Sequence, residues 1–485
     1  MKLSNYEIMM PLDDSWYLLA NGLYCAFDVV ELWEGKALEE GRLDAIPAGE
    51  RQRLLARGHL TETPEAELED LKLMAGYYRK YRAESNLGLL ILPTYDCNFR
   101  CPYCFERHRL CRGEEWLHKT MSKEMVDAIF QAVENEKARG VKAKSCQLYG
   151  GEPFLEKNSE LVRYIVRKAA DAGMTLSAVT NGYSLDCFLD LLEEYPFKSL
   201  QITLDGVKED NDRRRVYIGG GGSFEKIMEN TGLAVSKGIK TSIRINTGPS
   251  NLERVHLLKQ VFEDRGLTAF PEFSYYYAPT KGETHVQTDS ELTCREIVDT
   301  LIQNGFEEKE AMEHVSHYSV YMGGIRDLIK TQTYFSPSDS HCGAEKMMYL
   351  IDPEGAIYTC WDCVARENMR VGRVDTEKGK FAFNFSLLQW NFRNVLNMPK
   401  CMKCPYVFVC GGGCAAWAYK ETGNISEPYC GEVEEIFRDS AVEVCREMFA
   451  ESRERELTKS LKDQITKYRQ EQGKQADRPS AGRAR

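Results

Sequence analysis

The sequence lacks any apolar run long enough to cross a membrane. No stretch approaches the roughly 18 consecutive apolar residues that a membrane-spanning helix needs. The first residues also lack the long apolar core of a secretory signal peptide, and two aspartates, Asp13 and Asp14, occur early. We therefore expect a cytoplasmic protein with no membrane partner.

The sequence also lacks an excess of positive charge. Its 63 lysines and arginines are outnumbered by 74 aspartates and glutamates, which gives a net charge of −11. Proteins that bind nucleic acid through a broadly basic surface show the opposite balance, so we expect no nucleic-acid partner. A basic peptide is compatible with this charge. The glycine run at 219–222 lacks the GKS or GKT ending of a P-loop and predicts no phosphate site.

The 485 residues exceed what one hydrophobic core usually serves, so several domains are expected. In residues 1–85 a pair of strands joined by a turn precedes three helical patterns, which predicts a small α+β domain of winged-helix type. The expected strands are 6–10 and 16–19, and the expected helices are 26–33, 47–57 and 65–81.

Residues 86–280 alternate between strand and helix patterns. This alternation predicts six β/α units and a mainly parallel sheet. Periodicity alone leaves open whether the sheet closes partly into a barrel or stays open and doubly wound. The expected strands are 89–94, 146–149, 175–179, 200–204, 241–246 and 270–277.

Polar or glycine-rich residues follow the first four of these strands. Parallel α/β folds build their sites at the carboxyl ends of strands, and four such segments in succession predict a site at that edge. The segments begin at Cys97, Gly150, Thr180 and Asp205.

Seventeen cysteines are the most informative residues present. A large chain without an export signal is expected to keep its thiols reduced, so clustered cysteines indicate bound metal rather than disulfides. Three cysteines lie between Cys97 and Cys104 (the first cysteine group), and eight lie between Cys342 and Cys430 (the second cysteine group). The scattered cysteines are expected to be small buried apolar residues. They are Cys25, Cys111, Cys146, Cys187, Cys294 and Cys445.

The first cysteine group has the spacing C-x3-C-x2-C, through Cys97, Cys101 and Cys104. Three thiolates on one loop can hold three irons of a [4Fe–4S] cluster and leave the fourth iron open to a small chelating ligand. The reduction potential of such clusters extends to roughly −700 mV, low enough to cleave a sulfonium. A zinc site completed by His108 has compatible spacing. The position after the first strand of a β/α series favours the iron–sulfur interpretation.

This part of the sequence resembles the radical S-adenosylmethionine superfamily. The resemblance rests on the cysteine loop, with aromatic Tyr103 before its last cysteine, and on Gly150-Gly151-Glu152-Pro153 after the second strand. It covers roughly residues 89–280 and implies a partial (β/α)6 barrel, a [4Fe–4S] cluster and bound S-adenosylmethionine. It also implies that one electron cleaves this cofactor and that the resulting 5′-deoxyadenosyl radical abstracts hydrogen from a substrate carbon.

The resemblance further implies roles for individual residues. The glycine-rich motif is expected to receive the methionine amino group and Arg215 the methionine carboxylate. Polar residues after the third strand and on the fourth are expected near the ribose and the substrate. The implied cofactor-binding residues are Tyr103, Gly150, Gly151, Glu152, Thr180, Asn181, Thr203 and Arg215.

The second cysteine group resembles the SPASM extension of radical enzymes that modify peptides, with paired zinc knuckles as an alternative. The resemblance implies two auxiliary [4Fe–4S] clusters, and therefore three clusters in the chain. Cys363 is an addition to the SPASM pattern, and we expect it to complete the nearer cluster. The expected ligands are Cys342, Cys360, Cys363 and Cys414 for the nearer cluster and Cys401, Cys404, Cys410 and Cys430 for the outer one.

The expected fold is therefore α/β, a partial barrel with an added α+β domain before it and a cysteine-rich iron–sulfur domain after it. The domain at 1–85 resembles the small domains with which peptide maturases recognise a leader peptide. The remaining expected parts are the barrel at 86–280, a helical connector at 281–341, the SPASM domain at 342–430, a C-terminal helix at 431–470 and a disordered tail at 471–485.

Two reactions compete within this family. One joins a cysteine thiol of a ribosomal precursor peptide to a carbon, as in sactipeptide and ranthipeptide thioethers. The other is anaerobic sulfatase maturation, where relatives often carry aspartate directly after the cysteine that matches Cys360. Here Trp361 occupies that position, and Asp362 follows as a candidate base beside Glu272 and Tyr276. The expected partners are a precursor peptide and an electron donor such as flavodoxin or ferredoxin, and a non-catalytic metal-binding scaffold is the alternative from another class.

Overall fold

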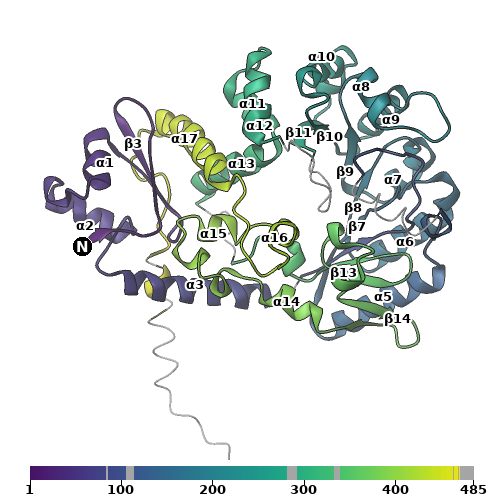
Figure 1. Cartoon of the computed structure of the whole chain (residues 1–485), viewed down its shortest axis with the longest axis horizontal. Helices are drawn as coiled ribbons and strands as arrows, with labels where there is room; N and C mark the ends of the chain where they lie inside the picture. The colour runs from purple at the N-terminus through teal and green to yellow at the C-terminus, as the bar shows by residue number, and fades with distance from the viewer. Residues whose placement is uncertain are drawn as a thin grey trace, which may run out of the picture.

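The computed structural model describes residues 1–83, 86–104, 114–280, 292–332, 339–462, 464–467 and 469. The molecule is elongated, with an N-terminal unit at one end and a β/α barrel at the other (Figure 1). The candidate ligand His108, the scattered Cys111 and the predicted tail at 471–485 lie outside the described residues. No helix in the described ranges combines the length and apolarity that crossing a membrane requires.

Six parallel strands form the barrel, and their order in the sheet follows the chain without reversal. Because crossovers between parallel strands are right-handed, this order puts all the connecting helices on one face and curves the sheet. A doubly wound sheet would need a reversal of strand order, so the partial barrel is the form adopted. The strands are β6 (Asn86–Ile91), β7 (Lys142–Leu148), β8 (Thr175–Thr180), β9 (Phe197–Leu204), β10 (Thr241–Thr247) and β11 (Phe273–Pro279).

Amphipathic helices cover the convex face of the barrel (Figure 1). On the concave face the Tyr276 hydroxyl donates to Gln201 Oε1 at 2.9 Å, although β10 lies between their strands. The helices between the barrel strands are α4 (Glu114–Leu117), α5 (Lys123–Ala138), α6 (Ser159–Asp171), α7 (Leu189–Glu194), α8 (Lys208–Arg214), α9 (Phe224–Ser236) and α10 (Leu257–Asp264).

The barrel sheet continues into the second cysteine group. Strand β12 (Met348–Ile351) pairs in parallel with β6, and three antiparallel strands extend the sheet beyond it. The pairing of β12 with β6 begins six residues after Cys342. Backbone hydrogen bonds therefore join the expected barrel domain at 86–280 to the expected SPASM domain at 342–430. The added strands are β13 (Ala356–Tyr358), β14 (Gly372–Asp375) and β15 (Lys380–Phe383), and the short helices that follow are α14 (Ser386–Phe392), α15 (Val407–Cys410) and α16 (Ala415–Thr422).

Three helices of the connector cover the outer edge of the barrel at β11, and a long C-terminal helix packs against them (Figure 1). They are α11 (Cys294–Gln303), α12 (Glu308–His314), α13 (Ser316–Thr331) and the C-terminal α17 (Val433–Ser452). The helix expected over 431–470 therefore ends earlier, at Ser452, and the chain turns at Arg453, which has φ +59°.

The N-terminal unit is an α+β domain whose first two main strands form the expected hairpin. The helix expected over 26–33 is wrong, because Ala26–Glu31 forms a third strand. This segment is rich in β-branched and aromatic residues, and it is buried on both faces of the sheet. The elements are β1 (Lys2–Leu3), β2 (Glu7–Pro11), β3 (Trp16–Asn21), β4 (Ala26–Glu31), α1 (Leu32–Glu39), α2 (Ala48–Arg57), β5 (Leu60–Thr61) and α3 (Pro64–Ala83).

The two ends of the described chain meet at this unit (Figure 1). The Val29 N–H donates to the Arg455 carbonyl at 2.7 Å, and the Leu457 N–H donates to the Phe27 carbonyl at 2.9 Å. The segment after α17 thereby occupies the outer edge of β4. The N-terminal unit consequently docks on the C-terminal part of the chain.

A buried ionic network underlies the sheet of the N-terminal unit. His59 Nδ1 lies 2.9 Å from Glu7 Oε1, and His59 Nε2 lies 2.5 Å from Asp28 Oδ2, so an imidazolium donates to both carboxylates. Arg57 also donates to Asp28 Oδ2, at 2.7 Å. Burial lowers the pKa of His59, but the two carboxylates outweigh this and raise it to about 9. For Asp28, burial raises the pKa, and His59 and Arg57 together lower it to about 2.

We predict that the N-terminal unit loses stability as pH rises towards and above 9. Since the pKa of His59 is higher in the folded state, its contribution is complete below about pH 6.5 and disappears as pH passes through about 9. Between these two limits, the contribution of His59 to the free energy of unfolding changes by on the order of 3 kcal/mol. Hydrogen exchange of the β2–β4 amides, corrected for intrinsic rates, measures this loss. His59→Gln should flatten the pH dependence of the stability of this unit. His118→Gln, on an exposed histidine of the barrel, should retain that pH dependence. An equal slope of stability against pH in wild type and His59→Gln would contradict the prediction.

Candidate functional site

The loop that carries the first cysteine group follows β6 and folds back on itself. The Phe99 N–H points at Cys97 Sγ, 3.4 Å away, and the Cys104 N–H donates to the Cys101 carbonyl at 3.2 Å. Burial, the Glu152 carboxylate and the charges of Cys104 and Cys101 raise the pKa of Cys97 well above its usual value. The three thiols are thus close enough to repel one another as thiolates, a repulsion that bound iron would relieve.

A second segment runs antiparallel to this loop. The Arg100 N–H donates to the Val216 carbonyl at 2.8 Å, and the Ile218 N–H donates to the Asn98 carbonyl at 2.9 Å. Phe99 and Tyr217 form the bridge between them. The segment directly after α8 therefore fixes the loop, which puts Arg215 beside the first cysteine group.

Glu152 joins the ends of the second and third barrel strands. Its carboxylate accepts from Thr180 Oγ1 at 2.5 Å, from the Asn181 N–H at 2.6 Å and from the Phe154 N–H at 3.0 Å. Burial raises its pKa. The Asn181 amide nitrogen donates in turn to Asn98 Oδ1 at 2.7 Å. The residues predicted at these two strand ends do lie together, beside the cysteine loop.

Gly151 lets two parts of the site approach closely. Its φ is +39°, and a Cβ there would lie 2.2 Å from the Asp96 carbonyl oxygen. The Glu152 N–H donates to that same oxygen at 2.7 Å. The resemblance implied that this glycine-rich motif receives the methionine amino group. In the structure the close approach is to the backbone of the cysteine loop itself.

Asp205, at the end of β9, gathers three side chains of the site. It accepts from the Tyr103 hydroxyl at 2.7 Å and from Arg214 Nε at 2.9 Å. Arg215 Nη1 donates to the Tyr103 hydroxyl at 3.0 Å. Tyr103 and Arg215 were predicted for this site, whereas the organising role of Asp205 and Arg214 was missed. The feature of the sequence that could have revealed the role of Asp205 is its position directly after a buried strand.

Arg215 has the properties expected of a carboxylate-binding residue. Its side chain is buried, and among the described residues its Nε has no hydrogen-bond partner. A guanidinium is suited to bidentate recognition of a carboxylate. The donor groups present therefore fit a ligand with an amino-acid carboxylate, such as the methionine part of S-adenosylmethionine.

The concave face next to this site is polar. Gln201 and Thr203 alternate along β9 and Asp205 directly follows it, while Arg244 and Asn246 alternate along the neighbouring β10. Arg244 Nε donates to Asn246 Oδ1 at 2.9 Å, and Asn246 Nδ2 lies 3.5 Å from Asp205 Oδ1. A polar substrate can therefore enter the barrel without leaving its hydrogen-bonding groups unpaired.

The second cysteine group separates into two sets in space. In the first set, burial and the charges of Cys410, Cys404 and Cys430 raise the pKa of Cys401 to about 12. In the second, a hydrogen bond with Cys363, burial and the charge of Cys414 raise the pKa of Cys360 well above its usual value. Burial and the charges of Glu345 and Cys414 likewise raise the pKa of Cys342 to about 12.

The cysteines of each set therefore lie near one another, in the same two sets that the resemblance to the SPASM extension implied. The first set consists of Cys401, Cys404, Cys410 and Cys430, and the second of Cys342, Cys360, Cys363 and Cys414. Of the scattered cysteines, Cys146, Cys294 and Cys445 are buried as expected, whereas Cys187 is exposed.

A fully buried ion pair organises this region, and no motif in the sequence pointed to it. Arg393 Nη1 donates to Glu345 Oε1 at 2.6 Å, and Arg393 Nη2 donates to the carbonyls of Gly412 and Glu427 at 3.0 Å. Gly413 brings two segments of the loop together, since a Cβ there would lie 1.6 Å from the Tyr429 carbonyl oxygen. Breaking such a buried pair typically costs about 3–5 kcal/mol.

The turn from Cys360 to Cys363 approaches the barrel site. The rings of Trp361 and Tyr149 lie 6.0 Å apart between centroids, and Tyr149 directly precedes the glycine-rich motif. Asp362 is half-buried in this turn. By contrast Glu272 precedes β11, at the amino end of the sheet, so the structure argues against Glu272 as a base.

Three comparisons with known proteins agree with this geometry. The profile of the Radical SAM superfamily matches residues 91–261. The cysteine-type anaerobic sulfatase-maturating enzyme of Clostridium novyi is 24% identical over 345 residues, which cover 68% of this chain and 88% of that enzyme. The S-adenosylmethionine-dependent nucleotide dehydratase of Psychrobacter lutiphocae is 30% identical over 167 residues, 33% of this chain and 55% of that protein.

The fold also has a solved counterpart. Native anSMEcpe with bound AdoMet superposes with a TM-score of 0.56 at 19% sequence identity, covering 75% of this chain and 100% of that one. At this identity the likeness concerns the fold. That family implies a [4Fe–4S] cluster and S-adenosylmethionine, and the thiols and the buried guanidinium described above are suited to hold them. The match over residues 91–261, together with the curved parallel sheet and the cysteine loop at its carboxyl edge, identifies this part of the chain as a Radical SAM domain.

Proposed function

We propose that the protein is a peptide maturase that forms a cysteine thioether in a ribosomal precursor peptide. The observation that carries this proposal is the closeness of two thiol-rich sites, where the Cys360–Cys363 turn approaches the barrel edge through Trp361 and Tyr149. A solved structure with this fold is native anSMEcpe with bound AdoMet and the Cp18Cys peptide. That precedent supports a peptide as the class of substrate.

In this proposal each group of thiols holds a [4Fe–4S] cluster. Cys97, Cys101 and Cys104 hold the one that binds S-adenosylmethionine, and the two sets of the second cysteine group hold one auxiliary cluster each. When bound, the first cluster and its cofactor supply a 5′-deoxyadenosyl radical that abstracts hydrogen from the peptide. Cys430 is exposed, which supports delivery of electrons at that side by a flavodoxin or ferredoxin.

The proposed cofactor contacts come from the residues that gather at the barrel edge. Arg215 binds the methionine carboxylate, because its guanidinium is buried with a donor to spare. The amino group is received beside Glu152, and Thr203 faces the substrate from β9. The other proposed contacts come from Tyr103, Gly150, Gly151, Thr180 and Asn181.

Asp362 is the proposed base for the peptide thiol. It lies in the turn next to Trp361, which is 42% exposed and approaches the ring of Tyr149. Its carboxylate would take the thiol proton as the carbon–sulfur bond forms, and the one electron released would pass to the auxiliary cluster that Cys342, Cys360, Cys363 and Cys414 would hold. The second candidate function is maturation of a sulfatase, and the similarity to the Clostridium novyi enzyme over 68% of the chain favours it. Thioether formation retains sulfur in the product, whereas formylglycine formation from cysteine removes it.

We also propose that the N-terminal unit receives the leader of the precursor as an added strand. The outer edge of β4 is already occupied by the segment around Leu457. In the three-stranded sheet β2-β3-β4, β2 is the other edge strand. An added strand would therefore pair with Glu7–Pro11 and would replace the hydrogen bond that Arg438 of α17 donates to the Met9 carbonyl at 2.9 Å.

The first prediction is the reaction itself. Under anaerobic conditions, with a reductant and S-adenosylmethionine, the iron-replete protein should form 5′-deoxyadenosine. A cysteine-containing peptide encoded beside it should lose two hydrogens per crosslink without losing sulfur. The same peptide without its leader should react more slowly. Loss of sulfur from the peptide would indicate the sulfatase-type reaction, and absence of 5′-deoxyadenosine would support a non-catalytic scaffold instead.

The second prediction uses a matched pair of glycines. Gly151→Ala introduces a Cβ 2.2 Å from the Asp96 carbonyl, so it should displace the cysteine loop and reduce both bound iron and 5′-deoxyadenosine formation. Gly173→Ala is the control, since its φ is +75° and no atom lies within 4 Å of the position its methyl group would take. It should cost about 1 kcal/mol of stability and leave iron unchanged. Full iron and full activity in Gly151→Ala would refute the role given to this contact.

The third prediction concerns Cys363, which is buried and hydrogen-bonded to Cys360. If it is the fourth ligand of the nearer auxiliary cluster, Cys363→Ala should change the Mössbauer and paramagnetic resonance spectra of that cluster and lower its iron occupancy. Cys187→Ala, at an exposed cysteine remote from both groups in sequence, is the control. Unchanged iron and spectra in Cys363→Ala would remove Cys363 from the ligand set.

A further inference from the structure

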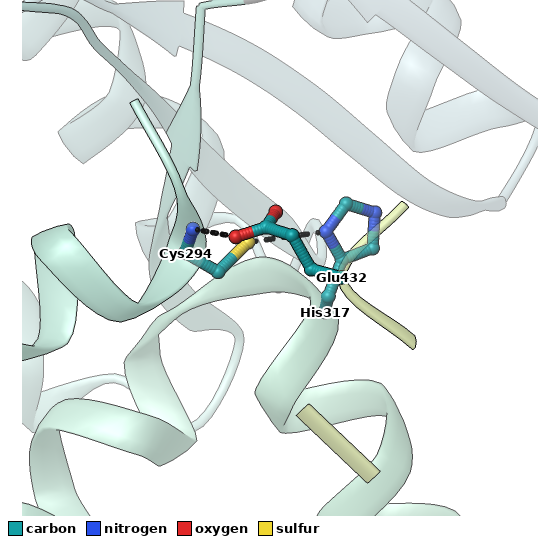
Figure 2. Close-up of side chains that lie close together, drawn as sticks. All are labelled: Cys294, His317 and Glu432. Atoms are coloured by element: carbon teal, nitrogen blue, oxygen red, sulfur yellow. Dashed lines mark hydrogen bonds between the residues drawn. The ribbon is translucent and has the colours of Figure 1, made fainter. Parts of the chain in front are cut away.

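Three side chains outside both cysteine groups converge where α11, α13 and α17 meet (Figure 2). Cys294 is the first residue of α11, His317 lies in the first turn of α13, and Glu432 directly precedes α17. Cys294 Sγ lies 3.2 Å from His317 Nδ1, and Glu432 Oε1 accepts from the Cys294 N–H at 2.8 Å. One ligand atom from each residue lies within 4.8 Å of the other two.

The separation of Cys294 Sγ from His317 Nδ1 is close to that of two ligands in a tetrahedral zinc site. Zinc binds sulfur at about 2.3 Å, imidazole nitrogen at about 2.0–2.1 Å and carboxylate oxygen at about 2.0–2.2 Å. Tetrahedral angles then set the ligand atoms roughly 3.3–3.7 Å apart. The 3.2 Å between sulfur and nitrogen needs only a small expansion to admit the ion. The three residue types are those that zinc prefers.

The charges of the site also suit a divalent cation. A Cys294 thiolate and the Glu432 carboxylate together carry two negative charges, and a neutral His317 adds none. The N-terminus of α11, a helix of ten residues with Thr293 as its side-chain cap, favours a thiolate at its first position. Cys294 is fully buried and its two neighbours are half-buried, so an ion there would be largely shielded from water.

We propose that Cys294, His317 and Glu432 bind one zinc ion, with water as the fourth ligand. The ion links two helices of the connector to the segment that leads into α17. Glu432 follows Cys430 by two residues, so the zinc site would anchor the chain where it leaves the second cysteine group. This site is separate from the iron ligands and does not depend on the proposed reaction.

Zinc analysis of the anaerobically purified, iron-replete protein tests the proposal. We expect about one zinc per chain in the wild type, and background zinc with unchanged iron in Cys294→Ser and in His317→Gln. Cys187→Ser, at an exposed cysteine, should retain its zinc. Equal zinc in wild type and both variants, or no zinc in wild-type protein after incubation with zinc sulfate and dialysis, would overturn the proposal and leave a cysteine–histidine hydrogen bond.

If either variant also loses iron, its zinc content no longer identifies the site that held the zinc. X-ray absorption at the zinc edge of the wild-type protein then identifies the ligands of the ion. The proposed site requires one sulfur at about 2.3 Å together with nitrogen and oxygen at about 2.0–2.2 Å. A shell made only of sulfur would mean that zinc has replaced iron in a cysteine group, and that result would also overturn the proposal.

Discussion

The parallel pairing of β6 with β12 is the constraint on which the arrangement of the two cysteine groups depends. Gly88 to Ile91 pair residue by residue with Met348 to Ile351, and the Leu92 N–H adds a hydrogen bond to the Ile351 carbonyl at 3.0 Å. β6 leads into the first cysteine group, while the turn after β12 leads through β13 to Cys360. A shift of one residue in this register would turn every side chain of β12 to the opposite face. The separation of the two groups is therefore set by backbone hydrogen bonds.

Side chains reinforce this pairing. The Tyr95 hydroxyl, just before the first cysteine group, donates to Asp352 just after β12. The Tyr95 ring stacks on Trp116 with 4.0 Å between centroids. Within the second cysteine group, the Arg393–Glu345 pair ties the start of the region to its glycine-rich loop, so part of its order comes from buried polar contacts. Iron would then bind to thiols that the chain has already brought together, which reduces the entropy lost on binding.

The sequence predicted those features that depend on local pattern. The barrel strands and the cysteine groups follow from short-range periodicity and spacing, and the structure has them. The strand at 26–31 was missed because Asp28 interrupts an apolar run in the way a helix surface does; its ion pairs come from residues about thirty positions away. Asp205 was expected at the site, but its hydrogen bond with Tyr103 was missed, as was the ion pair of Arg393 with Glu345. Their partners are distant in the chain, and only the folded structure brings them together.

Cys294 shows how incomplete a prediction from one residue can be. It was expected to be a small buried apolar residue, and it is buried. Its partners are His317, 23 residues away, and Glu432, 138 residues away. No spacing motif spans such intervals, so the sequence could not distinguish a core thiol from a ligand. Packing of α13 against α17 supplies the missing information, since it brings the two partners to the N-terminus of α11.

The shared sheet has a consequence for any peptide substrate. Because β6 and β12 fix the first cysteine group relative to the turn at Cys360, the space between them is largely defined before a peptide binds. Trp361 and Tyr149 border this space, and Arg244 and Asn246 line the polar concave face beyond it. The N-terminal unit docks on the C-terminal part of the chain, beside α17. Recognition of a leader there would act by tethering, which raises the local concentration of the reacting segment without reshaping the site.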